Sequence, residues 1–460
     1  MGAEPLAPMM LLSLAVVLFA GFPVAFSLAA VGGVFGAIGI ATGHFKATFL
    51  LAMILRLQGT FFNDNLLAIP LLVFMGMVLE RTGLAEDMFE ALHRLFGRTP
   101  GALAYSVIIV GAVLSAVTGF VSASVIALGL IAMPPLLRAG YDHRLAAGAV
   151  AAGGTLAQVM PPSLVLIVLA EQLEVSLIDI YRGALLPALL LVASYLGYIR
   201  LATWWRPQLA PAAVAGTSEA ADLPARWKNA ASAAGLPIGL LAAVLLAIYF
   251  GVAAPSEGGA IGVTAALLLA FAKRRLTFHR MQEAMMAAGL LCSSVIFLLF
   301  GASFFTLVFR GLDGHLWIEE LFKHLPAGQM GFLVVLNAAI FLLAFFLDFF
   351  EIAFIVLPLV APIARSIGVD MVWLAVLLAV NLQTSFMHPP FGIALYNLRS
   401  VTPRSVATTS IYWGAIPFVI LQLFMVIVLL AIPQLVIRSK PGPIDVNRTI
   451  IELPPPDDQQ

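Results

Sequence analysis

Charged residues are scarce in this chain: aspartate, glutamate, lysine and arginine together make up 10% of its 460 residues. Hydrophobic residues make up 62%, whereas a soluble domain has about 45–50% apolar and about 25% charged residues. A water-soluble fold could not bury that much apolar surface, so the composition excludes a soluble protein and predicts one that faces lipid. The formal net charge is zero, which argues against nucleic acid as a partner.

Cysteine is almost missing, and so are the sequence signatures of enzymes. Cys292 is the single cysteine, so the chain can form neither an internal disulfide nor a cysteine cluster for a metal ion. No phosphate-binding loop ending in GK[ST] and no HExxH pair occurs in the sequence. We therefore expect a protein that is not an enzyme and whose energy comes from an ion gradient or a partner.

Apolar runs that suit membrane-spanning helices recur along the whole chain. Two further segments, Ala41–Asn65 and Leu276–Met286, are amphipathic and predict helices near the membrane interface. Basic loops such as Lys273–Arg280 fit the cytoplasm, whereas the acidic Glu171–Asp179 and Asp313–Glu320 fit the outer side. The eight candidate spans are Met9–Ala20, Pro23–Ala41, Leu66–Leu79, Ile180–Trp204, Leu236–Val252, Gly258–Phe271, Leu290–Phe309 and Ser410–Val436.

Two longer apolar stretches, Ala102–Leu137 and Gly331–Ile367, are too long for one simple span and are interrupted by polar residues near their middles. The loop charges are mutually consistent only if each stretch enters and leaves the membrane on one side. We therefore predict two re-entrant helical hairpins, at 102–137 and 331–367.

An internal repeat relates the two halves of the chain, with an offset of 228 residues between Gly140 and Gly368. Each of these glycines is followed, 21 residues later, by a proline pair, Pro161-Pro162 in the first half and Pro389-Pro390 in the second. An odd number of predicted crossings separates the copies. We therefore expect an all-α polytopic membrane protein with inverted repeats, an architecture found in secondary transporters.

Each predicted repeat holds scaffold helices, one hairpin and one broken helix, at 145–170 in the first half and 371–398 in the second. Proline removes an amide donor, and paired glycines relax the backbone, so these two helices should break. Carbonyl groups freed by such a break must lie against protein or a water-filled cavity. The predicted division of the chain is 1–205 for the first repeat, 206–229 for a polar loop, 230–436 for the second repeat and 437–460 for a polar tail.

Hard oxygen atoms gather at the predicted hairpin turns, Thr118–Ser124 and Leu347–Glu351, and at the helix breaks. Unwound carbonyls with serine, threonine and asparagine oxygens suit Na⁺, and the N-termini of half-helices suit a carboxylate. The pattern predicts two cation sites around one central anion site. The hydroxyl groups could equally bond to their own helices, His388 could be structural, and the acids near Asp348 could lie in water.

Four stretches carry a resemblance to a known family: Ala68–Gly76, Val159–Ser163, Ala254–Glu257, and Asn381–Ser385 leading to Pro389-Pro390-Phe391-Gly392. Through them the chain resembles the large, DctM-like membrane subunit of TRAP (tripartite ATP-independent periplasmic) transporters. The resemblance implies an elevator-type fold and import of small organic acids with Na⁺ as the transported coupling ion. It also implies a bacterial inner-membrane location and two partners, a small four-helix membrane subunit and a periplasmic substrate-binding protein.

The resemblance further implies where ligands bind. One Na⁺ site is expected between Ser122/Ser124 and Gly153–Thr155, and the other between the Asp348 turn and Asn381–Ser385. The expected cation ligands are Thr118, Gly119, Ser122, Gly153, Gly154, Thr155, Asp348, Asn381, Gln383, Thr384 and Ser385. The expected substrate-binding residues are Ser122, Ser124, Pro161, Pro162, Ser163, His388, Pro389 and Pro390.

Other interpretations stay open on the sequence. A self-sufficient Na⁺- or H⁺-coupled organic anion permease would work without a binding protein, and uptake by this chain alone would favour it. A membrane scaffold that transports nothing predicts no loss of activity when Ser122 or Asn381 is replaced. An ion channel would need a continuous pore, which paired hairpins do not favour.

Overall fold

The computed structural model describes residues 5–62, 64–97, 99–211, 223–323, 328–345, 347, 349–388 and 392–437. These residues form helices and connecting turns, with no strand among them. Seven helical segments are long and apolar enough to cross a bilayer, and the bent pair formed by α4 and α5 would be an eighth. The all-α polytopic membrane protein predicted from composition is therefore confirmed.

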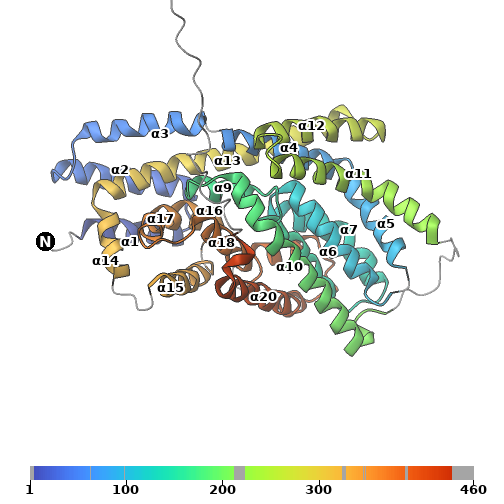
Figure 1. The fold of residues 1–460 in the computed structure, drawn as a ribbon. Coiled ribbons are helices and arrows are strands. Elements are labelled where there is room, and N and C mark those ends of the chain that lie inside the picture. Colours follow the sequence, from blue (N-terminus) through green and yellow to red (C-terminus); the bar gives the residue numbers. More distant parts are fainter. Residues whose placement is uncertain are drawn as a thin grey trace, which may run out of the picture.

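The chain runs through twenty helices within the described residues (Figure 1). Each candidate span predicted from hydropathy overlaps one of them, but α11 and α13 begin well before the predicted starts at Leu236 and Leu290. The helices are α1 (Leu6–Phe19), α2 (Val24–Ala41), α3 (Ala52–Phe61), α4 (Asp64–Arg81), α5 (Leu84–Phe96), α6 (Ala102–Thr118), α7 (Val121–Arg138), α8 (His143–Thr155), α9 (Leu164–Gln172), α10 (Leu177–Trp205), α11 (Leu223–Tyr249), α12 (Pro255–Ala272), α13 (Phe278–Gly311), α14 (Gly314–Lys323), α15 (Gly328–Leu343), α16 (Phe349–Glu351), α17 (Leu357–Ser366), α18 (Met371–Ser385), α19 (Ile393–Val401) and α20 (Thr408–Ala431).

Two expected boundaries differ from the structure. The segment 276–286, expected as a separate interfacial helix, begins the 34-residue helix α13 instead. Thr277 caps α13, and no glycine or proline interrupts the helix before Gly289, so nothing in the sequence stops it. The expected loop at 206–229 is shorter, because α11 already begins at Leu223. Residues 212–222 and the predicted tail from residue 438 lie outside the described residues.

The helix starts recur with the 228-residue offset found in the sequence. α7 corresponds to the segment Phe349–Ser366, which comprises α16, a π-turn and α17, and α8 corresponds to α18. Asp142 and Asp370 cap α8 and α18 in the same way, each accepting from two backbone N–H groups of the first helical turn. The repeat is therefore a repeat of local structure, while the inverted orientation of the halves stays a prediction.

Scaffold helices of one half pack on scaffold helices of the other. α4 of the first half packs on α12 of the second. In the repeat-related pair, α13 of the second half, which corresponds to α4, packs on α2 of the first half, which corresponds to α12. Glycine allows the close approach, because a Cβ on Gly301 of α13 would lie 2.6 Å from the Ala25 carbonyl oxygen of α2. In the view of Figure 1, α2, α3, α4, α12 and α13 lie along the upper side and α10, α15, α18 and α20 on the lower side.

The two predicted hairpin regions differ in how their arms pack. α6 and α7 pack against each other and both lie on α8. In the second half, α15 packs on α18 and α20, while α17 packs on α14 and the adjoining π-turn, Ile352–Val356, on α13. The two arms of the first hairpin therefore pack together, and we call this hairpin closed. The two arms of the second pack on different helices, and we call it splayed. That both are re-entrant stays a prediction.

Candidate functional site

The first broken helix is interrupted after Thr155. A 3-10 turn, Leu156–Gln158, leads to the proline pair, and the chain resumes as α9. Ser163 caps α9: its Oγ accepts from the Val165 N–H at 3.1 Å and donates to the Ala157 carbonyl at 2.6 Å. The prolines cannot continue α8 because they lack N–H donors. The break therefore leaves the last carbonyls of α8 without the helical partners that would otherwise cover them.

The turn of the first hairpin lies directly on this break. Gly119, with φ +62°, is so close to α9 that a Cβ there would lie 2.9 Å from the Leu164 backbone nitrogen. On the other side of the turn, a Cβ on Gly154 would lie 2.9 Å from the Cα of Val125. Only glycine fits at these two contacts. The structure thus brings the predicted turn and the predicted break together.

Ser115 joins the hairpin to the carbonyl groups at the end of α8. Its Oγ lies 2.9 Å from the Gly153 carbonyl oxygen and 3.0 Å from that of Gly154. The side chain is fully buried. Ser115 was not predicted, because it lies in an arm of the hairpin and not at the turn or at the break; a serine in an otherwise apolar arm was the available signal.

The predicted hydroxyl ligands of this hairpin bond mainly to each other. Thr118 Oγ1 and Ser124 Oγ lie 2.5 Å apart, and Ser124 Oγ also donates to the Phe120 carbonyl at 3.1 Å. Both side chains are fully buried, whereas Ser122 is half-buried. A hydroxyl that donates once still offers lone pairs to a cation, so these bonds leave the oxygens available as ligands.

In the second half, Asn381 occupies the position that corresponds to Gly153. Its Nδ2 donates to the carbonyl oxygen of Asn337 at 2.8 Å and to the side-chain Oδ1 of Asn337 at 3.0 Å. Asn337 lies on α15, the first arm of the second hairpin, as Ser115 lies on the first arm of the first. Each hairpin therefore places a polar side chain on the same position of its broken helix. Sequence reasoning also missed Asn337.

The other predicted ligands of the second half bond within their own helix. Thr384 Oγ1 donates to the Asn381 carbonyl at 2.7 Å, and Ser385 Oγ donates to the Leu382 carbonyl at 2.5 Å. This is the local bonding that the sequence left open as an alternative. Asp348, Pro389 and Pro390 lie outside the described residues.

His388 lies between α18 and the first arm of the second hairpin. Its ring stacks on Phe345 with centroids 4.0 Å apart and meets Phe341 edge-on at 5.2 Å. The side chain is buried. An imidazole held flat against an aromatic ring is fixed in orientation, so His388 presents its ring nitrogens in a defined direction beside the second break.

A buried polar chain joins the two broken helices. Gln383 Nε2 lies 3.3 Å from Thr155 Oγ1 and 3.3 Å from the Tyr195 hydroxyl, to which Gln422 Nε2 donates at 2.8 Å. All four side chains are fully buried. The Thr155 side chain therefore faces the second half rather than the serines of the first hairpin. Tyr195 and Gln422 were missed, although polar residues in apolar spans are a functional signal.

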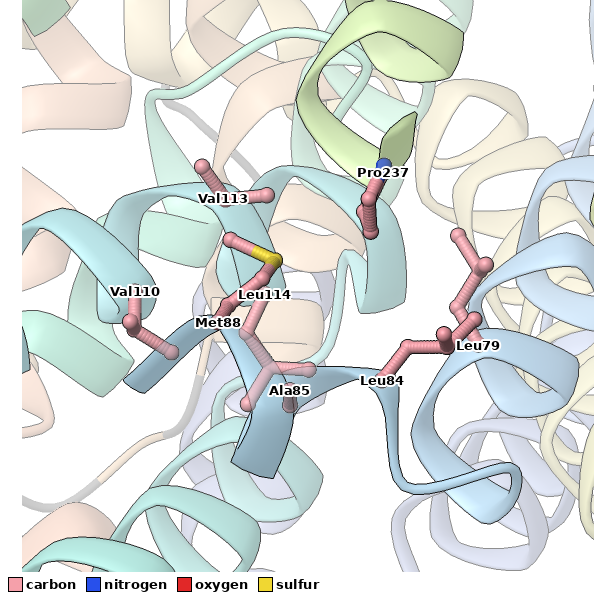
Figure 2. Close-up of a pocket in the computed structure, with 8 residues that line it drawn as sticks. All are labelled: Leu79, Leu84, Ala85, Met88, Val110, Val113, Leu114 and Pro237. Carbon is pink, nitrogen blue, oxygen red and sulfur yellow. The ribbon is translucent and has the colours of Figure 1, made fainter. Parts of the chain in front are cut away.

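A separate apolar cavity lies where the scaffold meets the first hairpin, and Figure 2 shows its lining. The eight residues drawn there come from α4, α5, α6 and α11 and are all apolar. Such a lining offers no polar group for a cation or a carboxylate. The candidate transport site is therefore the region of the hairpins and helix breaks, and not this cavity. Its lining residues are Leu79, Leu84, Ala85, Met88, Val110, Val113, Leu114 and Pro237.

The comparison with known families decides the identity of this arrangement. Residues 11–435 match the DctM component of the tripartite ATP-independent periplasmic transporters. The chain belongs to this family. Among solved structures, the YdaH transporter of Alcanivorax borkumensis has the same fold, with a TM-score of 0.59 at 16% identity over 93% of this chain and 98% of that one.

Curated relatives are TRAP permeases. The chain is 26% identical over 387 residues to the C4-dicarboxylate TRAP transporter large permease protein of Pseudomonas aeruginosa, covering 83% of this chain and 87% of that protein. It is 23% identical over 377 residues to the 2,3-diketo-L-gulonate large permease protein of Escherichia coli, covering 81% and 86%. It is 24% identical over 374 residues to the sialic acid permease protein of Haemophilus influenzae, covering 81% and 59%.

Membership of the TRAP family establishes the general role of the chain. It is a multi-pass protein of the bacterial inner membrane and a permease rather than an enzyme. Large subunits of this family belong to secondary transporters that work with a small membrane subunit and a periplasmic binding protein. The family therefore decides against the self-sufficient permease, the scaffold and the channel.

Proposed function

We propose that this TRAP large subunit imports small carboxylates and couples their uptake to Na⁺. The observation that carries the proposal is the pair of contacts between hairpin and break, Ser115 on Gly153 and Gly154, and Asn337 on Asn381. Each contact gathers carbonyl, hydroxyl or amide oxygens in a buried place beside an unwound stretch. Oxygens of this kind suit Na⁺ and are the usual surroundings of coupling ions in broken-helix transporters.

The first Na⁺ binds between the hairpin turn, Thr118–Ser124, and the carbonyl groups of Gly153 and Gly154. The support is that these groups meet at the first break, where the packing leaves no room for side chains at Gly119 and Gly154. The second Na⁺ binds beside Asn381–Ser385, and Asp348 remains an expected ligand of it. Hydroxyls of Thr384 and Ser385 keep lone pairs for it after donating within α18.

The carboxylate binds between the two breaks. The N-terminus of α9 at Ser163 presents backbone N–H groups and the positive end of the helix dipole. His388, held by Phe345, supplies a further donor, and Pro161-Pro162 keeps the first break from continuing as a helix. The names of relatives support the substrate class, because C4-dicarboxylates, 2,3-diketo-L-gulonate and sialic acid all carry carboxylates.

Transport follows an elevator-type movement, in which α6–α10 and α15–α20 slide against α2, α4, α12 and α13. Three observations support this division. α8 packs extensively on α20, which ties the two hairpin regions into one body, whereas α4 pairs with α12 and α13 with α2 in the other. α4 and α5 join the bodies through a 63° bend. The apolar cavity of Figure 2 lies at this boundary, and its lining residues make no polar contact that would oppose sliding.

Uptake of a radiolabelled C4-dicarboxylate into proteoliposomes tests the proposal. The large subunit, the small subunit and the binding protein are each omitted in turn, and an inward Na⁺ gradient is compared with choline at a clamped membrane potential. We expect uptake only with all three components and with Na⁺. Unchanged uptake in choline would contradict the Na⁺ coupling. Uptake of other organic acids but of no carboxylate would contradict the substrate class.

A further inference from the structure

Two buried hydrogen bonds join residues that are separated by the repeat offset or by one position less. Gln383 and Thr155 lie 228 positions apart in the sequence, and Gln422 and Tyr195 lie 227 apart. Residues at corresponding or adjacent positions of two repeats can touch only close to the axis that relates the repeats. The four side chains therefore mark that axis, and each pair takes one member from each half.

The polar chain ends at both proposed cation sites. Thr155 is the last residue of α8, directly after Gly153 and Gly154, and Gln383 follows Asn381 by two residues on α18. Gln383 uses its amide nitrogen to reach Thr155 and Tyr195, while its Oε1 is buried and has no hydrogen-bond partner among the described residues. A buried acceptor is costly to leave without a partner, and a cation beside Asn381–Ser385 would supply one.

We propose that this Thr155–Gln383–Tyr195 bridge couples the two cation sites, so that filling one changes the affinity of the other. The proposal rests on the proposed Na⁺ coupling. A cation on Gln383 Oε1 polarises the amide group and makes its N–H a stronger donor to Thr155 Oγ1. That hydroxyl then becomes a better donor to the Ala152 carbonyl, in the same helix turn as the Gly153 and Gly154 carbonyls of the first site. By linkage, occupation of the first site acts equally on the second.

Tyr195 acts as a positioning residue in this bridge. Its hydroxyl accepts from Gln383 and from Gln422, which fixes the plane of the Gln383 amide. The Tyr195 ring is itself held edge-on by Phe418 at 5.2 Å. Replacing tyrosine by phenylalanine therefore removes the acceptor oxygen and leaves the ring packing in place.

The test is the Na⁺ dependence of uptake in Tyr195→Phe, with Tyr181→Phe as the matched control. Tyr181 lies on the same helix, is also buried, and its hydroxyl has no hydrogen-bond partner among the described residues. We expect a Hill coefficient for Na⁺ near 2 in the parent and in Tyr181→Phe. In Tyr195→Phe it should fall toward 1, and the apparent Na⁺ affinity should weaken about fivefold or more. The substrate KM at saturating Na⁺ should stay unchanged.

Gln383→Glu provides a second, independent variant. It keeps the Oε1 ligand, replaces the amide nitrogen by a second oxygen and so loses both N–H donors, which cuts the bridge to Thr155 while an oxygen ligand remains. Because the added charge alters Na⁺ affinity by itself, the readout is the Hill coefficient, measured by equilibrium ²²Na⁺ binding to the purified subunit. We expect a value near 1.

The possible failures can be told apart. A parent protein whose uptake ignores Na⁺ would overturn the proposed function. A parent with a Hill coefficient near 2 that persists in Tyr195→Phe and in Gln383→Glu would overturn the bridge and leave the Na⁺ coupling intact. The same fall in Tyr181→Phe as in Tyr195→Phe would show a general packing effect, which also overturns the bridge.

Discussion

The two halves of this transporter are built from corresponding helices, yet they close their hairpins differently. In the first half α6 and α7 lie together on α8, and Ser115 reaches the freed carbonyls of Gly153 and Gly154. In the second half α15 lies on α18, and α17 lies on α14. The same topology therefore supports one hairpin whose arms pack together and another whose arms do not; under the proposed function, cation and substrate would close the second.

The size of a few side chains explains this difference. Gly111 and Gly153 cross so closely that a Cβ on Gly111 would lie 2.7 Å from the Cα of Gly153. The corresponding residues of the second half are Ala339 and Asn381. Ala339 is exposed rather than buried in a crossing. Glycine permits the tight contact in the first half, and its absence prevents that contact in the second.

The largest effect is expected from Gly111→Ala. The added Cβ would meet backbone atoms of α8 that cannot move aside, and overpacking of this kind costs about 1–3 kcal/mol. We expect a lower thermal unfolding midpoint and loss of most uptake. Ala339→Leu, at the corresponding position of the splayed hairpin, should leave both unchanged. Equal sensitivity at the two positions would contradict the assigned difference between the halves.

His388→Phe tests whether the second break binds the carboxylate through a side chain that the first break lacks. Phenylalanine keeps the stacking on Phe345 and removes the ring nitrogens. We expect the substrate KM to rise about tenfold, the loss of one hydrogen bond to a charged group, with the Na⁺ dependence unchanged. Phe345→Ala should instead lower kcat, because it loosens the aromatic contact. An unchanged KM in His388→Phe would show that the imidazole only packs.

Ser115→Ala should weaken the first cation site by a smaller amount. The hydroxyl that fixes the Gly153 and Gly154 carbonyls is lost, and a hydrogen bond contributes about 0.5–1.5 kcal/mol net. We expect half-maximal uptake to need roughly three- to tenfold more Na⁺. Ser106→Ala is the control: Ser106 is buried on the same helix but donates to its own backbone at Ala102. A Na⁺ requirement that changes equally in both variants would contradict the role of Ser115.

The smallest effect is expected at the bends that follow α4 and α13, between the scaffold and the next segment. At the first bend, between α4 and α5, Arg275 donates to the Thr82 and Gly83 carbonyls and to Asp87. At the corresponding bend of the second half, at the end of α13, Gly311 packs on the rings of Phe45 and Phe49 instead.

Arg275→Met removes the hydrogen bonds to the Thr82 and Gly83 carbonyls and the ion pair with Asp87. Because the Arg275 side chain is 36% exposed, its bonds contribute modestly. We expect kcat for uptake to fall about twofold with KM unchanged, and Lys273→Met, on the same loop, to behave as the parent. A changed KM would place Arg275 in substrate binding and contradict the view that it only holds the bend between α4 and α5.

Local sequence features were enough to predict where the helices break. Pro161-Pro162 is enough to stop a helix, although Gly153 and Gly154 remain helical within α8, and the apolar length of Ala102–Leu137 already indicates a hairpin. Whether a hairpin is closed depends on Gly111, whose partner lies 42 positions away in the sequence, at Gly153. No local pattern contains that information.

The residues that join the candidate sites could not be predicted from the sequence. Ser115, Asn337 and Tyr195 are single polar side chains in apolar helices, and their partners lie between 38 and 227 positions away. Thr155 was correctly selected as a polar residue at a break, yet its side chain bonds to Gln383 of the other repeat. The direction in which such a side chain points and the partner it bonds depend on how the helices pack, and the sequence does not show that packing.

Hydrogen exchange of the purified subunit in lipid nanodiscs, in Na⁺ and in K⁺, tests the central claim most directly. A hairpin closed by its own packing should exchange slowly in both salts, whereas a hairpin closed by a cation should be protected only in Na⁺. The account predicts slow exchange at 121–138 in either salt and Na⁺-dependent protection at 349–366. Equal exchange at 349–366 in the two salts, or a Na⁺ effect confined to 121–138, would contradict it.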